Sequence, residues 1–69
     1  MRAARRFREA AGLSIHEAAG RIGAQPASIS RFEVGAGLRE PTMKAYAKLL
    51  GVSLEDLLAT EPDPEAVSA

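Results

Sequence analysis

Apolar residues recur every three or four positions along most of this chain, the spacing that gathers side chains on one face of an α-helix. Glycines stand where successive apolar segments end, as left-handed helix stops do: Gly12, Gly23, Gly35 and Gly51. The pattern predicts helices at residues 2–11, 15–22, 26–33, 41–50 and 54–59. Because no segment has the alternation typical of a strand, we expect an all-α fold, a compact bundle of five helices.

Four of these predicted helices have a start signal in the sequence. Ser14 followed by Glu17 has the capping-box pattern, in which each side chain accepts the backbone N–H of the other residue. Ser53 begins a weaker version of the same pattern. Pro26 and Pro41 fit the first helical position, where the missing N–H costs nothing.

The apolar positions of these helices are sufficient for one small core. The residues expected in it are Phe7, Ala11, Leu13, Ala18, Ala19, Ile22, Ile29, Phe32, Met43, Tyr46, Ala47, Leu50, Val52, Leu57 and Leu58. The last ten residues, TEPDPEAVSA, are acidic and proline-rich, with little to bury. We therefore expect one domain at residues 1–59 and, at residues 60–69, a disordered acidic tail or a linker to a further domain or partner.

Charge is distributed unevenly along a chain whose nine basic and nine acidic residues cancel. Up to Arg39 there are seven arginines and three glutamates, whereas the remainder has two lysines and six acidic residues. Only the first part of the chain therefore has the charge to attract phosphate groups.

Composition argues against several classes of function. Cysteine is absent and histidine occurs once, as His16, so neither a disulfide framework nor a metal site is expected. We also expect no cofactor and no enzymatic activity, since there is no carboxylate pair beside a histidine, no thiol and no phosphate-cradling glycine loop. No apolar run approaches the ~20 residues needed to span a bilayer, and the N-terminus lacks a secretory h-region, so we expect a cytoplasmic protein without membrane contact.

The most informative stretch, IHEAAGRIGAQPASISRFEV at residues 15–34, has two short helices around a turn at residues 23–25. Ala19 is small enough for the helices to approach where they cross, and Gly23 can take the positive φ of a tight turn. Ile29 points back from the second helix into the core. This spacing predicts a helix-turn-helix motif whose second helix is turned outward.

The segments GLSIHEAAGRIGAQPASISRFEVG and REPTMKAYAKLLGVSLEDLL resemble the XRE family, the Cro and phage-repressor-like helix-turn-helix proteins. The resemblance runs from about Phe7 to Leu58. It implies a five-helix bundle of the phage-repressor-like type that binds operators in double-stranded DNA as a dimer, with the second motif helix in the major groove.

By position, the resemblance also implies which residues meet DNA. Those facing the groove are Gln25, Pro26, Ala27 and Arg31, and those near phosphate or the minor groove are Ser28, Val34 and Arg39. A backbone N–H is all that the segment around Val34 offers to a phosphate.

The chain departs from the family pattern at several of these positions. Ile15 stands where family members usually have a glutamine that holds a phosphate, so one anchoring contact is missing. Pro26 and Ala27 replace common polar side chains, which leaves Gln25 and Arg31 as the main candidates for hydrogen bonds to base edges.

Other arginines of the first helix leave alternatives open. Arg8 and Glu33 match a pair that in the family joins the first helix to the end of the recognition helix, and the pair is either partly buried or exposed. Arg2, Arg5 and Arg6 either touch phosphate or belong to a solvated helix. Gln25 serves as a helix cap or contacts a base.

Two functions compete. The first is a sequence-specific transcription regulator, a repressor that binds a palindromic operator as a homodimer, for which the leucines of residues 54–59 would suit a dimer seam. The second is a protein-interaction module or antitoxin that keeps the fold with weakened DNA contacts and binds its partner through the acidic C-terminal end. The neutral net charge favours the second, as do the residues that replace polar side chains of the family pattern: Ile15, Pro26, Ala27 and Val34.

Overall fold

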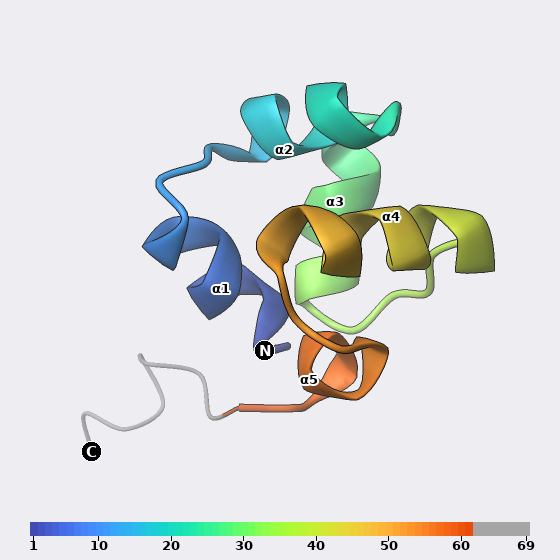
Figure 1. The fold of residues 1–69 in the computed structure, drawn as a ribbon. Coiled ribbons are helices and arrows are strands. Elements are labelled where there is room, and N and C mark those ends of the chain that lie inside the picture. Colours follow the sequence, from blue (N-terminus) through green and yellow to red (C-terminus); the bar gives the residue numbers. More distant parts are fainter. Residues whose placement is uncertain (62–69) are drawn as a thin grey trace, which may run out of the picture.

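The computed structural model describes residues 1–61 of the chain. Its five helices are α1 (Ala4–Ala10), α2 (Ile15–Ile22), α3 (Pro26–Glu33), α4 (Glu40–Leu50) and α5 (Leu54–Leu58). Figure 1 shows α2 lying across one end of α3, with α4 in front of α3 and α5 below. Within the described residues the only strand-like pairing is one antiparallel bridge between Arg2 and Thr60. The predicted all-α fold is therefore confirmed.

The predicted boundaries of α2 and α3 are confirmed at both ends, whereas the first predicted helix begins too early. Arg2 lies outside α1 and forms an antiparallel bridge with Thr60. Its backbone N–H donates to the carbonyl of Glu33 (2.8 Å), and the N–H of Ala3 donates to that of Ala59 (2.7 Å). At the other end, α1 stops at Ala10, one residue short of the prediction. The last two helices differ from their predicted ranges by one residue at one end.

The capping box at Ser14 is confirmed. The N–H of Glu17 donates to Ser14 Oγ (3.0 Å), and the N–H of Ser14 donates to Glu17 Oε1 (3.1 Å). The hydrogen bond from the backbone N–H of Ser14 to the Glu17 carboxylate lowers the pKa of Glu17, and the Ser14 side chain lowers it further. At α5 the side chain of Ser53 accepts the N–H of Asp56 (3.0 Å). Gly23 ends α2 at φ +70°, the left-handed conformation that the turn requires.

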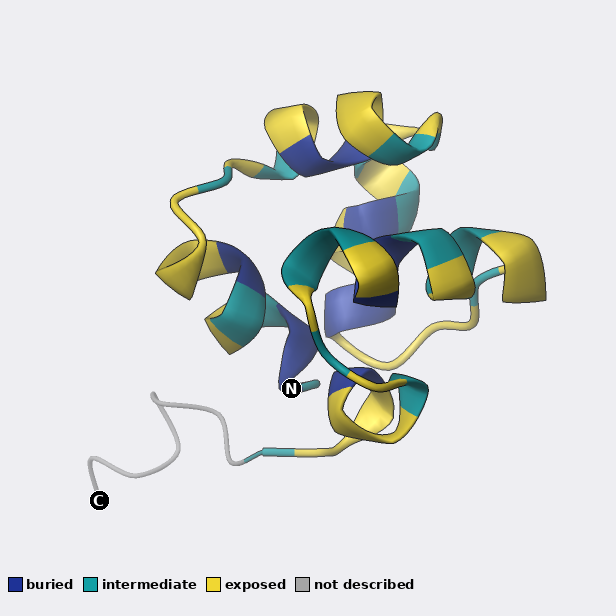
Figure 2. Cartoon of the chain, in the orientation of Figure 1, coloured by how far each residue is buried: buried dark blue, intermediate teal, exposed yellow. Residues whose placement is uncertain are grey.

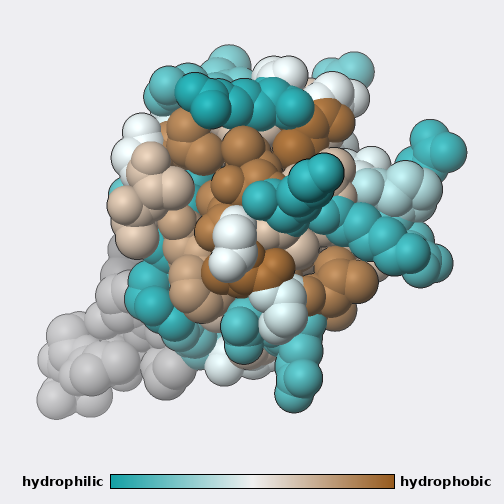
Figure 3. Space-filling model, viewed as in Figure 1, coloured by the Kyte–Doolittle hydropathy of each residue, from teal (hydrophilic) through white to brown (hydrophobic). Residues whose placement is uncertain are grey.

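The core lies where the helices face one another. Its buried residues are Ala4, Ala18, Ala19, Ile29, Phe32, Tyr46, Ala47 and Leu57. In Figure 2, α2 is buried on the side that faces α4 and exposed on the opposite side. Figure 3 shows apolar side chains gathered in the middle of this face of the molecule, with polar side chains around them.

Three residues expected in the core are not in it. Phe7 is half-buried but lies outside the core cluster, with the Arg6 guanidinium carbon 4.5 Å from the centre of its ring. Ala11 is exposed because α1 has already ended, and Leu58 lies on the outer side of α5 with 38% of its surface exposed. Four further buried residues were not expected in the core, and they lie at or near α1 and the end of α3: Ala3, Ala4, Arg8 and Glu33. Burial of the two charged residues has no signal in the hydrophobic pattern.

The two ends of the described chain are joined. Arg2 pairs with Thr60, and the N–H of Glu61 donates to the carbonyl of Met1 (2.7 Å). Arg6 Nε also forms an ion pair with Glu61 (3.0 Å). The residues on either side of Thr60 are therefore hydrogen-bonded to the N-terminal residues, while the expected domain boundary after residue 59 stays a prediction. The rest of the expected tail lies outside the described residues.

Candidate nucleic-acid interface

Helix α3 has one face in the core and one face open to solvent. Ile29 and Phe32 are fully buried, and Glu33 is 4% exposed. The opposite face consists of exposed Gln25, Ala27, Ser30, Arg31 and Val34. Within each face the residues recur at spacings of three and four, as expected for an amphipathic helix. The outer face has no acidic residue, because the one acid of α3 is inside the domain.

The side chains of Gln25 and Arg31 have no hydrogen-bond partner within residues 1–61. Gln25 occupies the N-cap position of α3, but its side chain makes no capping hydrogen bond. The cap interpretation of Gln25 is therefore wrong for the side chain. Pro26, which follows it, is at the start of the helix as expected and is half-buried. Ala27 and Arg31 lie one helical turn apart on the open face.

Four of the seven arginines in the first part of the chain have hydrogen-bond or ion-pair partners within the domain. Arg2 donates to the carbonyl of Phe32, and the others form ion pairs: Arg5 with Glu9, Arg6 with Glu61, and Arg8 with Glu33. Arg2, Arg5 and Arg6 thus each have an intramolecular partner, and their contact with phosphate stays a prediction.

The other three arginines are exposed and have no ion pair among the described residues: Arg21, Arg31 and Arg39. They lie on α2, on α3 and at the N-cap of α4. The arginines that remain available to a polyanion are therefore on the helix-turn-helix motif and at the end of the loop that follows it.

A shallow hollow of about 300 Å³ lies between the turn of the motif and the start of α4. Its lining includes Gln25, Ser28, Arg39 and Thr42, together with the backbone of the turn and of the loop before α4. The structure thus brings together three residues that the sequence analysis assigned to DNA, although Arg39 is on a different element from the other two. Thr42 was missed, because a threonine in the first turn of a helix has no distinctive signal.

Two apolar residues, Ile15 and Val34, stand at positions that the resemblance places near phosphate. Ile15 is half-buried and packs against the core, so it supplies no polar group to a phosphate. Val34 is 69% exposed, but its backbone N–H donates to the carbonyl of Arg31 (3.2 Å). This hydrogen bond closes the last turn of α3, and a phosphate contact by the segment around Val34 stays a prediction.

Arg8 and Glu33 form a buried ion pair, 8% and 4% exposed. Arg8 Nε donates to Glu33 Oε2 (2.6 Å) and Nη2 donates to Oε1 (3.2 Å), the two-point geometry that guanidinium and carboxylate favour. Arg8 Nη1 also donates to the carbonyl of Leu13 (2.9 Å). The question that the sequence left open is answered by this geometry, because the pair is inside the domain.

Tyr46 joins the same network from α4, with its hydroxyl donating to Glu33 Oε2 (3.4 Å). The hydrogen bond to Glu33 raises the pKa of Arg8, although burial acts in the opposite direction. Burial, and then the negative charge of Glu33, raises the pKa of Tyr46 to about 12. Phe32 packs edge-on against the Tyr46 ring, with centroids 6.2 Å apart. The network therefore holds the C-terminal end of α3 against both α1 and α4.

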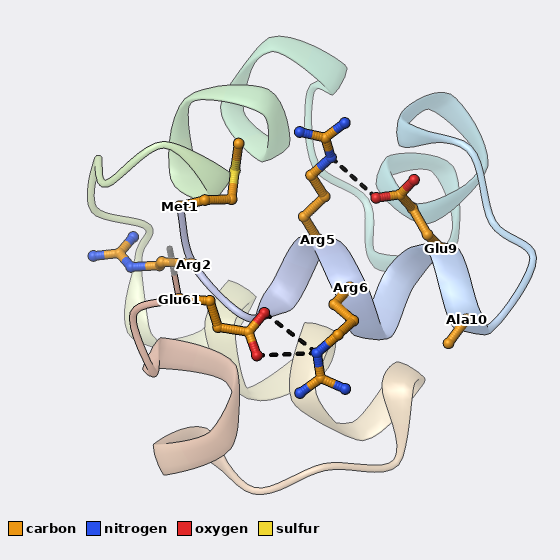
Figure 4. Close-up of a pocket in the computed structure, with 7 residues that line it drawn as sticks. All are labelled: Met1, Arg2, Arg5, Arg6, Glu9, Ala10 and Glu61. Atoms are coloured by element: carbon orange, nitrogen blue, oxygen red, sulfur yellow. Dashed lines mark hydrogen bonds and ion pairs between the residues drawn. The ribbon is translucent and has the colours of Figure 1, made fainter. Parts of the chain in front are cut away.

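A second hollow, of about 510 Å³, lies along α1 and contains no residue of α2 or α3. Figure 4 shows its polar lining, in which Arg5 pairs with Glu9 and Arg6 with Glu61. Because the charged groups of this hollow are already paired, we assign it no part in the interface. Within residues 1–61 there is no cluster of metal-ligating side chains and no helix long and apolar enough to cross a membrane.

The fold and the open face of α3 define a helix-turn-helix domain. A family model described as a helix-turn-helix domain matches residues 2–60, and the chain belongs to this family. The fold is that of DNA-binding domains of transcription regulators, in which the second helix of the motif enters the major groove. No curated protein and no solved structure matches the chain significantly.

Proposed function

We propose that this domain is a sequence-specific DNA-binding repressor of the XRE type, acting in the cytoplasm. The observation that carries the proposal is the outer face of α3, which is exposed, free of acidic residues and equipped with Gln25 and Arg31. Both side chains lack partners within the described residues, so neither has to break an internal hydrogen bond to reach a base. The opposite face of the helix is anchored by the core and by Glu33.

Few side chains read the bases in this proposal. Arg31 binds guanine through its O6 and N7 atoms, Gln25 binds adenine through N6 and N7, and Ala27 contacts a thymine methyl group. Each good bidentate pair provides ~1–3 kcal/mol of discrimination against the wrong base. With one arginine and one glutamine on the helix, phosphate contacts and DNA shape supply much of the remaining affinity.

The hollow between the motif turn and α4 is the proposed path of the DNA backbone. Ser28 and Arg39 line it from two elements, and Arg39 has no intramolecular ion pair in the described part of the chain. A guanidinium at this edge binds a phosphate while α3 enters the groove. Arg21, in the last turn of α2, is a further exposed arginine of the motif.

We further propose that the domain binds a palindromic operator as a homodimer. Val34 and Leu58 are the exposed large apolar residues of the described chain, and both line one hollow of about 240 Å³ beside Arg2 and Thr60. The patch is small, which favours a weak dimer that assembles on its operator. The expected leucine seam on α5 is reduced to Leu58, because Leu57 is buried in the core.

Selection of bound sequences from a random pool of duplexes tests the proposal and reports half-site spacing at the same time. Arg31→Ala should weaken binding to the selected sequence and relax the preference at one base pair. Arg5→Ala is the matched control, because it removes the same charge from an exposed position that is paired with Glu9. A pool without enrichment, or equal binding by the two variants, would contradict the proposed function.

The second candidate is a protein-interaction module, such as an antitoxin. The observation that favours it is Val34, an apolar residue 69% exposed at the end of the recognition helix. Titration of labelled random duplex at low salt separates the two functions. A DNA-binding protein gives salt-sensitive binding, whereas an interaction module gives none above background.

A further inference from the structure

The C-terminal turn of α3 is closed by hydrogen bonds around Arg31. The carbonyl of Arg31 accepts the N–H groups of Val34 (3.2 Å) and Ala36 (3.0 Å), and the carbonyl of Phe32 accepts the N–H of Gly35 (3.1 Å). The last carbonyls of a helix otherwise lack partners within it. The direction in which the Arg31 side chain leaves the helix thus depends on this turn staying closed.

Arg2, thirty residues before Phe32 in the chain, makes further hydrogen bonds to the carbonyls of this turn. Its backbone N–H donates to the carbonyl of Glu33 (2.8 Å), and its Nη1 donates to the carbonyls of Phe32 (2.9 Å) and Ala36. Its guanidinium carbon also lies 4.3 Å from the centre of the Phe32 ring. One residue therefore caps the end of the helix, ties the following loop to it and places a positive charge at the negative end of the helix dipole.

The backbone of Arg2 is itself fixed by the paired chain ends. Arg2 bridges to Thr60, and the N–H of Ala3 donates to the carbonyl of Ala59. In Figure 4 the Arg2 side chain points away from the Arg5 and Arg6 guanidinium groups, although all three line the same hollow. Arg2 is thus set apart from the exposed arginines of α1 by both its backbone and its side chain.

We infer that Arg2 is a positioning residue for DNA recognition, which keeps the last turn of α3 closed and so fixes the direction of Arg31. This inference rests on the proposed function. We assign Arg2 to the helix end and not to a phosphate, since its Nη1 donates to two carbonyls and its guanidinium carbon lies over the Phe32 ring. It acts on base recognition through the helix end.

The test compares Arg2→Ala with Arg5→Ala, which removes the same charge from an exposed position on α1. Binding to the selected duplex is measured across a salt series, and backbone amide exchange of the free domain is followed by NMR. Arg2→Ala should weaken specific binding about three- to tenfold, as expected for lost hydrogen bonds. Its salt slope should equal that of the wild type, and Arg5→Ala should bind like the wild type.

Amide exchange separates a local role from a general one. In Arg2→Ala the N–H groups of Gly35 and Ala36 should exchange faster, while that of Ala24, bonded to Ala19 in the motif turn, should change less. Arg2→Lys, which keeps the charge and a donor, should restore part of the binding and of the protection. If Arg2→Ala does not fold, Arg2→Lys should show a smaller loss at the same amides.

Three results would overturn the inference. A fall of roughly 0.9 in the salt slope would show that Arg2 binds a phosphate. Uniformly faster exchange would show a role in global stability alone, and unchanged binding and exchange would show no role. Failure of the wild type to bind any duplex refutes the proposed function instead, and the exchange data would still report whether Arg2 closes the helix end.

Discussion

Removing the Glu33 carboxylate tests how strongly the buried network holds α3. Glu33→Ala leaves the guanidinium of Arg8 inside the domain with one remaining acceptor, the carbonyl of Leu13. It also removes the acceptor of the Tyr46 hydroxyl, which is fully buried. One substitution thus removes the counterion of a buried charge and the acceptor of a buried hydroxyl.

The expected cost follows from burial. Breaking a buried ion pair by deleting one partner costs about 3–5 kcal/mol, because the other charge remains without water or a counterion. A folded chain of this size has a free energy of unfolding of about 3–9 kcal/mol. Glu33→Ala should therefore remove much of the stability of the domain, and a substantial fraction should be unfolded near room temperature.

Urea denaturation followed by circular dichroism measures this cost. Glu9→Ala is the control, since it breaks the Arg5 pair, whose side chains are 43% and 56% exposed. Exposed pairs contribute about 0–1 kcal/mol, so this variant should unfold close to the wild type. If Glu33→Ala costs less than about 1 kcal/mol, or no more than Glu9→Ala, the argument that the network anchors α3 is refuted.

Three further predictions concern other parts of the domain. Arg39→Ala should weaken binding to all duplexes alike and reduce the salt slope by roughly 0.9, and an unchanged slope in a gel-shift series would remove Arg39 from the phosphate path. Ser14→Ala should lower the free energy of unfolding by about 0.5–2 kcal/mol through loss of the cap of α2, measured by urea titration; no loss would show that the capping box is dispensable. Tyr46 should make the domain less stable in alkali: its pKa is about 12 in the folded state, against the ordinary tyrosine value of 10.0, so the unfolded state loses its proton first. Stability from this group is complete below pH 10 and should fall by about 2–3 kcal/mol as the pH rises to 12. Thermal unfolding of Tyr46→Phe should show a smaller decline over this range, and an equal decline in both proteins would contradict the assignment.

Local sequence signals determined most of the helical organisation. The capping box at Ser14 and the left-handed Gly23 bound α2, and Pro26 begins α3, because each signal acts through residues within one helical turn. The apolar Ile29 and Phe32 likewise decided which face of α3 is buried, so the outward direction of Gln25 and Arg31 follows from helical periodicity.

The tertiary structure decided what each charged residue does. Arg2 and Arg31 are the same type of residue, yet Arg2 caps the end of α3 and Arg31 is open to solvent. Arg8 and Glu33 are 25 residues apart, and their burial depends on α1 and α3 being brought together. Helical periodicity is a property of neighbours in the chain, whereas the partners of Arg2 and Arg8 across the fold lie 25 or more residues away, so no local pattern encodes them.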